Sequence, residues 1–236
     1  MSPKSGLRAI PGALGRSRCG TIAPGGSIFG NLYAPLSPLM RMKPYVLLAL
    51  ASVSLISVPM HAAEAKTESL VLGGGCFWCT DAAYKLLPGV KTVTCGYAGG
   101  QESNPTYGEV CDHLTGHAEV VKIAFDPAQV TLARLLEYFW LVHNPTQRGG
   151  QGNDHGPQYR SIILYANEAQ KLAAEKSRTE AQLEFRDPIT TEIVPLTKFW
   201  PAEGYHQDYF AKNPEAGYCQ FVIAPKIHKL AKKLGP

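Results

Sequence analysis

The sequence Ser-Leu-Val-Leu-Gly-Gly-Gly-Cys-Phe-Trp-Cys at residues 69–79 decides how the folded part of this chain begins. Its apolar first half predicts a short strand, and Gly73-Gly74-Gly75 lets the backbone turn tightly and lets another molecule approach closely. A helix is predicted from Cys76 to Leu87, where Pro88-Gly89 ends it. A cysteine therefore stands at the start of the first helix, immediately after a strand.

Strands and helices continue to alternate after this first unit. Further strands are predicted over residues 90–97, 118–125, 161–165 and 191–196. Helices are predicted over 131–143, capped by Thr131, over 167–185, capped by Asn167, and over 205–212, with a Gly-rich loop at 144–158. Because the alternation lacks strict βαβ regularity, we predict an α+β fold with a mixed sheet. About 170 residues suffice for one domain with a real core.

The charge of the chain is unevenly distributed along its length. Six of the 23 basic residues precede the first acidic residue, Glu64, so residues 64–236 carry 17 basic and 19 acidic side chains, a net charge of −2. The overall charge of +4 therefore gives no argument for a nucleic-acid partner. A hydrophobic fraction of 45% with 18% charged residues excludes disorder for most of the chain.

Residues 1–65 are predicted to be a leader. Residues 42–65 have a charged start at Met42-Lys43, an apolar centre over 46–58 and small residues around Ala63, the layout of a secretory signal peptide. The apolar centre is shorter than a membrane span, which needs roughly 20 residues. We expect export to the periplasm or secretion, without a permanent membrane span. Residues 1–41 are either an untranslated or disordered extension or an organelle transit peptide. An organelle or cytoplasmic location is the alternative to export.

Cys76 is the candidate nucleophile. A helix start offers unpaired N–H groups and a partial positive charge, which stabilise a thiolate. The alternative is a buried cysteine that acts as a small apolar residue. Phe77 and Trp78 either pack into the core or form an apolar pocket for a group such as a methyl. The odd number of cysteines in the mature chain argues against a disulfide framework, and no second Cys pair supports a zinc site.

Several further motifs, taken in order and spacing, resemble those of the A-type peptide methionine sulfoxide reductases. They are Gly75-Cys76-Phe77-Trp78, Gly96-Tyr97-Ala98-Gly99-Gly100, Asn104-Pro105-Thr106-Tyr107, Val110-Cys111, Thr115-Gly116-His117-Ala118-Glu119, Gln151-Gly152-Asn153-Asp154-His155-Gly156, Gln158-Tyr159-Arg160-Ser161, His206-Gln207-Asp208-Tyr209 and Gly217-Tyr218-Cys219. The resemblance spans about residues 69–228. It implies a catalytic domain at 66–236 with a two-layer α+β sandwich and a ferredoxin-like core.

The resemblance also implies the roles of the site residues. The implied nucleophile is Cys76, and the implied substrate site contains Phe77, Trp78, Tyr107, Glu119, Asp154 and Tyr159. Reduction of a sulfoxide requires that the leaving oxygen be protonated, and a carboxylic acid in an apolar site keeps its proton near neutral pH. Glu119 is the candidate acid. The two tyrosines can donate hydrogen bonds to the oxygen.

Two cysteines compete to form a disulfide with the Cys76 sulfenic acid. Cys219 matches the resolving position of the family and is predicted to lie in a flexible tail, and we favour it. Cys79 stands where many members carry glycine, and it lies one helical turn from Cys76. Cys95 and Cys111 are assigned to the interior.

A thioredoxin or a thioredoxin-like dithiol protein is the expected electron donor, with no bound cofactor or metal. The resemblance implies that the substrate is methionine S-sulfoxide, free or in proteins, and we expect a monomer. A thioredoxin-like disulfide oxidoreductase that uses Cys76 and Cys79 is the alternative enzyme class, and an exported redox-sensing domain is the non-enzymatic one.

Overall fold

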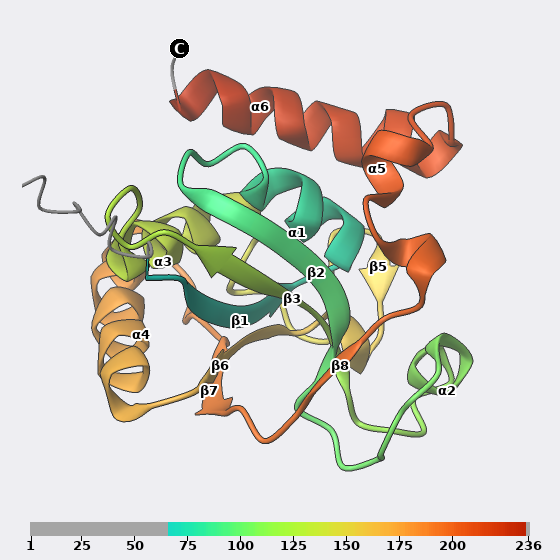
Figure 1. Ribbon diagram of the computed structural model, residues 1–236, viewed down its shortest axis with the longest axis horizontal. Helices are drawn as coiled ribbons and strands as arrows, with labels where there is room; N and C mark the ends of the chain where they lie inside the picture. Colours follow the sequence, from blue (N-terminus) through green and yellow to red (C-terminus); the bar gives the residue numbers. More distant parts are fainter. Residues whose placement is uncertain (1–65, 235–236) are drawn as a thin grey trace, which may run out of the picture. The chain divides into compact units, whose positions relative to one another are not determined.

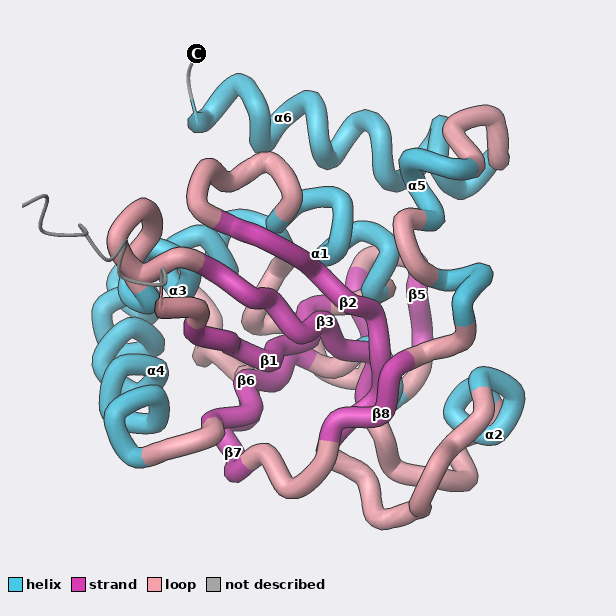
Figure 2. Tube along the Cα trace, in the orientation of Figure 1, coloured by secondary structure: helices cyan, strands magenta, loops and turns pink. Residues whose placement is uncertain are grey.

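The computed structural model describes residues 66–234 (Figures 1 and 2). These residues all belong to one compact unit. The predicted leader at 1–65 lies outside the described residues. Among residues 66–234, none of the helices combines the length and the apolar character needed to cross a membrane.

A six-stranded mixed sheet forms the centre of the fold. Its strands are β1 (Glu68–Gly74), β2 (Val90–Ala98), β3 (Ala118–Phe125), β6 (Ser161–Tyr165), β7 (Glu192–Pro195) and β8 (Phe199–Pro201), in the order β7-β6-β1-β3-β2-β8. Neighbouring strands are antiparallel except for β6 and β7, which are parallel. The predicted α+β class with a mixed sheet is therefore confirmed.

The ferredoxin-like core consists of β1, α1 (Phe77–Tyr84), β2, β3, α3 (Leu132–Val142) and β6. This β-α-β-β-α-β order, with β3 between β1 and β2, is the arrangement that the resemblance implies. The helices α4 (Glu168–Ala181) and α6 (Ala224–Leu234) pack against α3 and α1 on the same side of the sheet (Figure 1). The larger apolar core lies between these helices and the sheet.

The helix caps predicted from the sequence are present. The Thr131 side chain accepts a hydrogen bond from Arg134 N at 3.2 Å, and the Asn167 side chain accepts one from Gln170 N at 2.9 Å. The apolar positions of α3 face the core, where Leu135 is fully buried. Each cap satisfies an N–H group that has no partner within its helix, which fixes where the helix begins.

Other boundaries differ from the predictions. Helix α1 ends at Tyr84 instead of Leu87, and the predicted helix at 205–212 is divided into a 3-10 turn, Gly204–His206, and α5 (Tyr209–Lys212). Asp208 divides them because its φ of 58° lies in the left-handed region. The predicted Gly-rich loop contains a short hairpin of β4 (Gly150–Gln151) and β5 (Asp154–His155), followed by a 3-10 helix, η1 (Pro157–Tyr159). The sequence reasoning missed α2 (Tyr107–Cys111), β8, the π-helix at Cys219–Ile223 and α6.

Candidate active site

A pocket of about 200 Å³ brings together most of the predicted site residues. They come from the start of α1, from α2, from β3, from the β4–β5 hairpin with η1, and from the segment before α6. The lining residues are Cys76, Phe77, Trp78, Tyr107, Glu119, Asp154, Tyr159 and Tyr218. Every residue predicted for catalysis or substrate binding therefore lines this pocket, except Cys219.

The turn before α1 places Cys76 at the floor of this pocket. Gly75 has a φ of +95°, and a Cβ atom there would lie 2.7 Å from the Gln151 side chain, so only glycine fits. Cys76 is the N-cap of α1, but its side chain makes no capping hydrogen bond. The first free N–H group of the helix, Phe77 N, instead donates to Glu119 Oε2 at 3.0 Å.

Burial opposes the stabilisation of a Cys76 thiolate that the helix start predicts. Burial raises the pKa of the Cys76 thiol well above its ordinary value, and its hydrogen bond to Cys79 and the charge of Glu119 raise it further. Cys76 is only 8% exposed and the nearest helix amide is used by Glu119, so both features disfavour a thiolate here. Cys76 is therefore a protonated thiol until a neighbouring group takes its proton.

Cys79 is the titratable group hydrogen-bonded to Cys76. Its hydrogen bond with Cys76 lowers the pKa of Cys79, and the nearby Lys226 ammonium lowers it further. The Cys79 Sγ atom also lies 3.9 Å from the Tyr218 hydroxyl. Of the two coupled thiols, Cys79 holds negative charge more readily, and the proton between them can move in either direction.

Glu119 is a buried carboxylic acid beside this thiol pair. It lies on β3 opposite Tyr97 of β2 and is 1% exposed. Burial raises its pKa to about 8, although the hydrogen bond from Phe77 N acts in the opposite direction. A pKa of about 8 keeps most of the Glu119 carboxyl protonated at pH 7.

Two half-buried tyrosines line the same pocket. Burial raises the pKa of Tyr107 and that of Tyr159, so both keep their hydroxyl protons at neutral pH. Tyr107 is positioned at the start of α2 by a capping box, in which Thr106 and Glu109 exchange hydrogen bonds. Its backbone N–H also donates to Glu203 Oε1 at 2.9 Å. Both hydroxyls are thus available as neutral hydrogen-bond donors.

An aromatic cluster holds Trp78 in place. Its ring stacks on Tyr209 with centroids 3.7 Å apart, and its Nε1–H donates to His206 Nδ1 at 3.2 Å. His206 also lies against Phe77, with ring centroids 4.9 Å apart. The motif around His206 pointed to this cluster, but the sequence reasoning gave the histidine no role.

Tyr218 is a pocket residue that the sequence reasoning did not assign. Its hydroxyl donates to Asp154 Oδ2 at 2.7 Å, so it connects the segment before α6 with the β4–β5 hairpin. The ring also contacts Trp78 edge-on at 5.9 Å. Its position next to Cys219 in a quoted motif was the signal that could have identified it.

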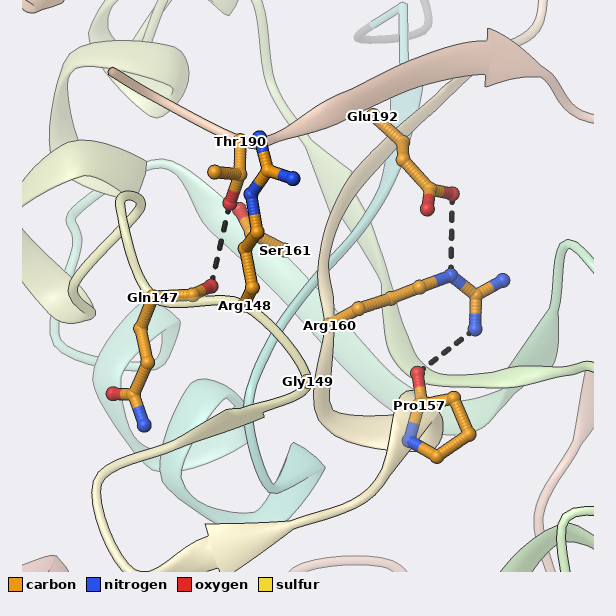
Figure 3. Close-up of a pocket in the computed structure, with 8 residues that line it drawn as sticks. All are labelled: Gln147, Arg148, Gly149, Pro157, Arg160, Ser161, Thr190 and Glu192. Carbon is orange, nitrogen blue, oxygen red and sulfur yellow. Dashed lines mark hydrogen bonds and ion pairs between the residues drawn. The ribbon is translucent and has the colours of Figure 1, made fainter. Parts of the chain in front are cut away.

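A larger pocket of about 410 Å³ lies on the other side of η1 and lacks the cysteines (Figure 3). Arg160 is the central side chain there. It donates to Glu192, to the Pro157 carbonyl and to the Gly116 carbonyl at 2.9–3.1 Å. These bonds fix η1, which carries Tyr159, to the loop that precedes Glu119, so this pocket supports the catalytic one structurally.

The remaining cysteines do not line the pocket. Cys219 is 0% exposed and begins the π-helix, which differs from the predicted flexible tail because its side chain packs into the main core. Cys95 is buried as predicted, whereas Cys111 is half-buried beside Tyr107. His117 makes structural hydrogen bonds to the backbone of Gly100 and Glu102, at 3.0 and 2.8 Å. Within residues 66–234 no group of three His, Cys, Asp or Glu side chains could hold a metal ion.

A reactive thiol pair, a neutral carboxylic acid and two tyrosine hydroxyls in one aromatic pocket define a thiol-dependent oxidoreductase. Residues 68–235 match the sequence model of the peptide methionine sulfoxide reductase family. The chain is 53% identical over 165 residues to peptide methionine sulfoxide reductase MsrA of Thermus thermophilus, which covers 70% of this chain and 94% of the relative. The Acinetobacter baumannii MsrA is 51% identical over 166 residues, with coverages of 70% and 95%.

Solved structures give the same result. Reduced Mxr1 of Saccharomyces cerevisiae has a TM-score of 0.63 at 35% identity, and covers 66% of this chain and 91% of its own. Methionine sulfoxide reductase A of Corynebacterium diphtheriae has a TM-score of 0.60 at 37% identity, with coverages of 67% and 80%. The chain belongs to the peptide methionine sulfoxide reductase family and is an enzyme of that class. The alternatives of a disulfide oxidoreductase and of a non-enzymatic domain are thereby set aside.

Proposed function

We propose that this enzyme reduces methionine S-sulfoxide through a sulfenic acid on Cys76 and an intramolecular disulfide. The observation that carries the proposal is the protonated Glu119 carboxyl, with a pKa of about 8, in the same pocket as the Cys76 thiol. A carboxylate of ordinary acidity would be ionised at pH 7 and could not supply the proton.

The aromatic walls suggest how the substrate lies. The S-methyl group packs against Phe77 and Trp78, whose rings are fixed by the cluster around His206. The sulfoxide oxygen then faces Glu119 and the hydroxyls of the two tyrosines, which donate hydrogen bonds to the negative charge that develops on it. Asp154, already bound to Tyr218, orients the substrate at the pocket rim.

The first chemical step transfers the oxygen atom. Cys76 passes its proton to Cys79 along their hydrogen bond, and the thiolate attacks the sulfoxide sulfur while Glu119 protonates the oxygen. The bond formed between the two sulfur atoms and the sulfur–oxygen bond of the substrate then break as the hydroxyl group passes to the Cys76 sulfur. Methionine leaves reduced, and Cys76 becomes a sulfenic acid, which is oxidised by two electrons.

The second step forms a disulfide and releases water. Cys79 is in hydrogen-bond contact with Cys76, and its lowered pKa favours the nucleophilic thiolate. We therefore propose that Cys79 condenses first with the sulfenic acid. Cys219, which the sequence analysis favoured, is fully buried and reacts only after its segment moves, by exchange with the Cys76–Cys79 disulfide.

An external dithiol completes the cycle. A thioredoxin or a thioredoxin-like protein gives two electrons and two protons to the enzyme disulfide and leaves as its own disulfide. We further propose that residues 42–65 direct export and that a membrane-fed donor acts outside the cytoplasm. N-terminal sequencing of the protein from a periplasmic fraction tests this, and a cytoplasmic protein that retains residues 42–65 would contradict it.

The activity is tested with the purified protein, dithiothreitol and the separate S and R epimers of protein-bound methionine sulfoxide. We expect turnover of the S epimer only, and none in Cys76→Ser. Equal turnover of both epimers, or activity that survives this substitution, would overturn the proposal.

Mass spectrometry identifies the disulfide. After one equivalent of substrate without reductant, we expect a stable Cys76–Cys79 linkage in Cys219→Ser, and in the parent the same linkage first, before Cys219 exchanges with it. We expect a persistent sulfenic acid, trapped by dimedone, in Cys79→Ser. A Cys76–Cys219 linkage in the Cys79→Ser variant at the parent's rate would instead make Cys219 the first partner.

A further inference from the structure

A groove of about 270 Å³ runs between α6 and the segment that follows α3. We call it the basic groove. Its lining side chains are Leu141, Val142, His143, Asn144, Gln151, Lys226, Lys229, Leu230 and Lys233. Three of them are lysines and none is a carboxylate, so the groove is positively charged along one side.

No carboxylate of the described residues lines the basic groove itself, although Lys233 also lines a neighbouring pocket that contains Glu137, Glu180 and Glu184. Among the ion pairs of residues 66–234, none involves Lys226, Lys229 or Lys233. Residues 66–234 carry 17 basic and 18 acidic side chains, a net charge of −1, and α6 contributes four lysines and no acid. The rest of this part therefore carries a net charge of −5, whereas α6 carries +4. Such segregation creates a local field that attracts an anionic partner.

The basic groove lies beside the redox centre. Lys226 is close enough to lower the pKa of Cys79. Helix α6 follows directly on the π-helix that begins with Cys219, and it packs on α1, which carries Cys79. The groove therefore flanks the enzyme disulfide whether Cys76 is joined to Cys79 or to Cys219. In Figure 1 no described element lies beyond the outer side of α6, and Lys229 and Lys233 are exposed.

We propose that the basic groove receives an acidic segment of the dithiol protein that reduces the enzyme disulfide. This inference rests on the proposed disulfide cycle. The groove shares no lining residue with the catalytic pocket, and the sulfoxide group carries no net charge, so the reacting group of the substrate does not explain it. A membrane surface is disfavoured because Ile227 and Leu230, the apolar side of α6, are buried in the core and cannot enter a bilayer.

Charge reversal separates docking from chemistry. The enzyme is assayed at low salt with an acidic thioredoxin, kept reduced by NADPH and thioredoxin reductase, and in parallel with dithiothreitol. We expect Lys229→Glu and Lys233→Glu each to raise the KM for thioredoxin about five-fold, the effect of one Coulomb contact at a wet interface. The dithiothreitol-driven rate should not change, and added salt should abolish the difference. Lys232→Glu, on the same helix but outside the groove, is the matched control and should change KM much less.

The outcomes discriminate between the hypotheses. An unchanged KM in both groove variants, or an equal change in Lys232→Glu, would overturn the groove as a docking site. Loss of the dithiothreitol-driven rate would also overturn it, because the lysine would then act within the reaction. Binding of the parent to phosphatidylglycerol vesicles that Lys229→Glu abolishes, with KM unchanged, would assign the groove to lipid. A parent without dithiothreitol-driven turnover would refute the proposed function itself.

Discussion

Replacing Glu119 by glutamine tests the protonation state on which the catalytic proposal depends. The pKa of this carboxyl is raised from 4.5 to about 8 by burial in the folded protein. Each unit of pKa corresponds to about 1.4 kcal/mol. Ionisation of Glu119 in both the folded and the unfolded state therefore lowers the free energy of unfolding by about 5 kcal/mol, relative to low pH where the carboxyl is neutral in both. Glutamine has nearly the same shape, can accept the hydrogen bond from Phe77 N, and does not ionise.

The sign of the effect follows from proton binding. Below pH 4.5 the carboxyl is neutral in both states and contributes no pH dependence. Between pH 4.5 and about 8 the unfolded chain loses the proton and the folded protein keeps it, so the free energy of unfolding falls as pH rises. Glu119→Gln removes this fall. We expect the variant to be more stable than the parent by about 3 kcal/mol at pH 7 and about 5 kcal/mol at pH 9.

Urea unfolding at pH 5, 7 and 9 measures this difference, and sulfoxide turnover with dithiothreitol measures the activity. We expect kcat to fall at least about 100-fold, the usual contribution of a general acid. Glu184→Gln, an exposed surface change, is the control for both measurements. A stability difference that stays constant from pH 5 to 9 would show that Glu119 is ionised at pH 7, and the reasoning would fail.

Three further substitutions test the surroundings of the pocket. Tyr159→Phe removes one donor to the sulfoxide oxygen and should lower kcat about ten-fold without changing KM. Arg160→Met removes the hydrogen bonds that fix η1, and should raise KM and speed amide hydrogen exchange in η1. Arg148 lines the same pocket of about 410 Å³, and Arg148→Met should have neither effect. His206→Phe removes the acceptor for Trp78 and should raise KM at every pH. In the parent, burial lowers the pKa of His206, and a protonated ring cannot accept the hydrogen bond from Trp78. The KM of the parent should therefore rise only in acid. A variant whose KM has the same pH dependence as that of the parent would contradict the reasoning.

The sequence predicted those elements whose signals are local. Strand β3 has the predicted bounds, and α3 begins after Thr131 as expected, because alternation and caps act within a few residues. The capping box at Thr106 could have revealed α2, and the apolar spacing of Ile227 and Leu230 could have revealed α6. Strand β8 could not be found in this way, since its three residues extend only because they pair with β2.

In the site, too, local sequence signals were predictive and features that depend on long-range packing were not. The motifs identified the side chains that line the pocket because each motif fixes residue types at a set spacing. The protonation of Cys76 could not be predicted, because it depends on how deeply the thiol is buried and on Glu119 taking the amide of Phe77. The burial of Cys219 likewise arises from packing against the core, which no local pattern near Asn213-Pro214 shows.

The hydrogen bond between Tyr218 and Asp154 has a consequence for biosynthesis. Cys76 leaves the ribosome long before Tyr218, so a nascent chain holds its nucleophile in a half-built pocket that lacks one wall. Cellular peroxide can then reach a cysteine that the finished fold covers. A chaperone that holds the chain until its last helix has been made would protect that sulfur from irreversible oxidation.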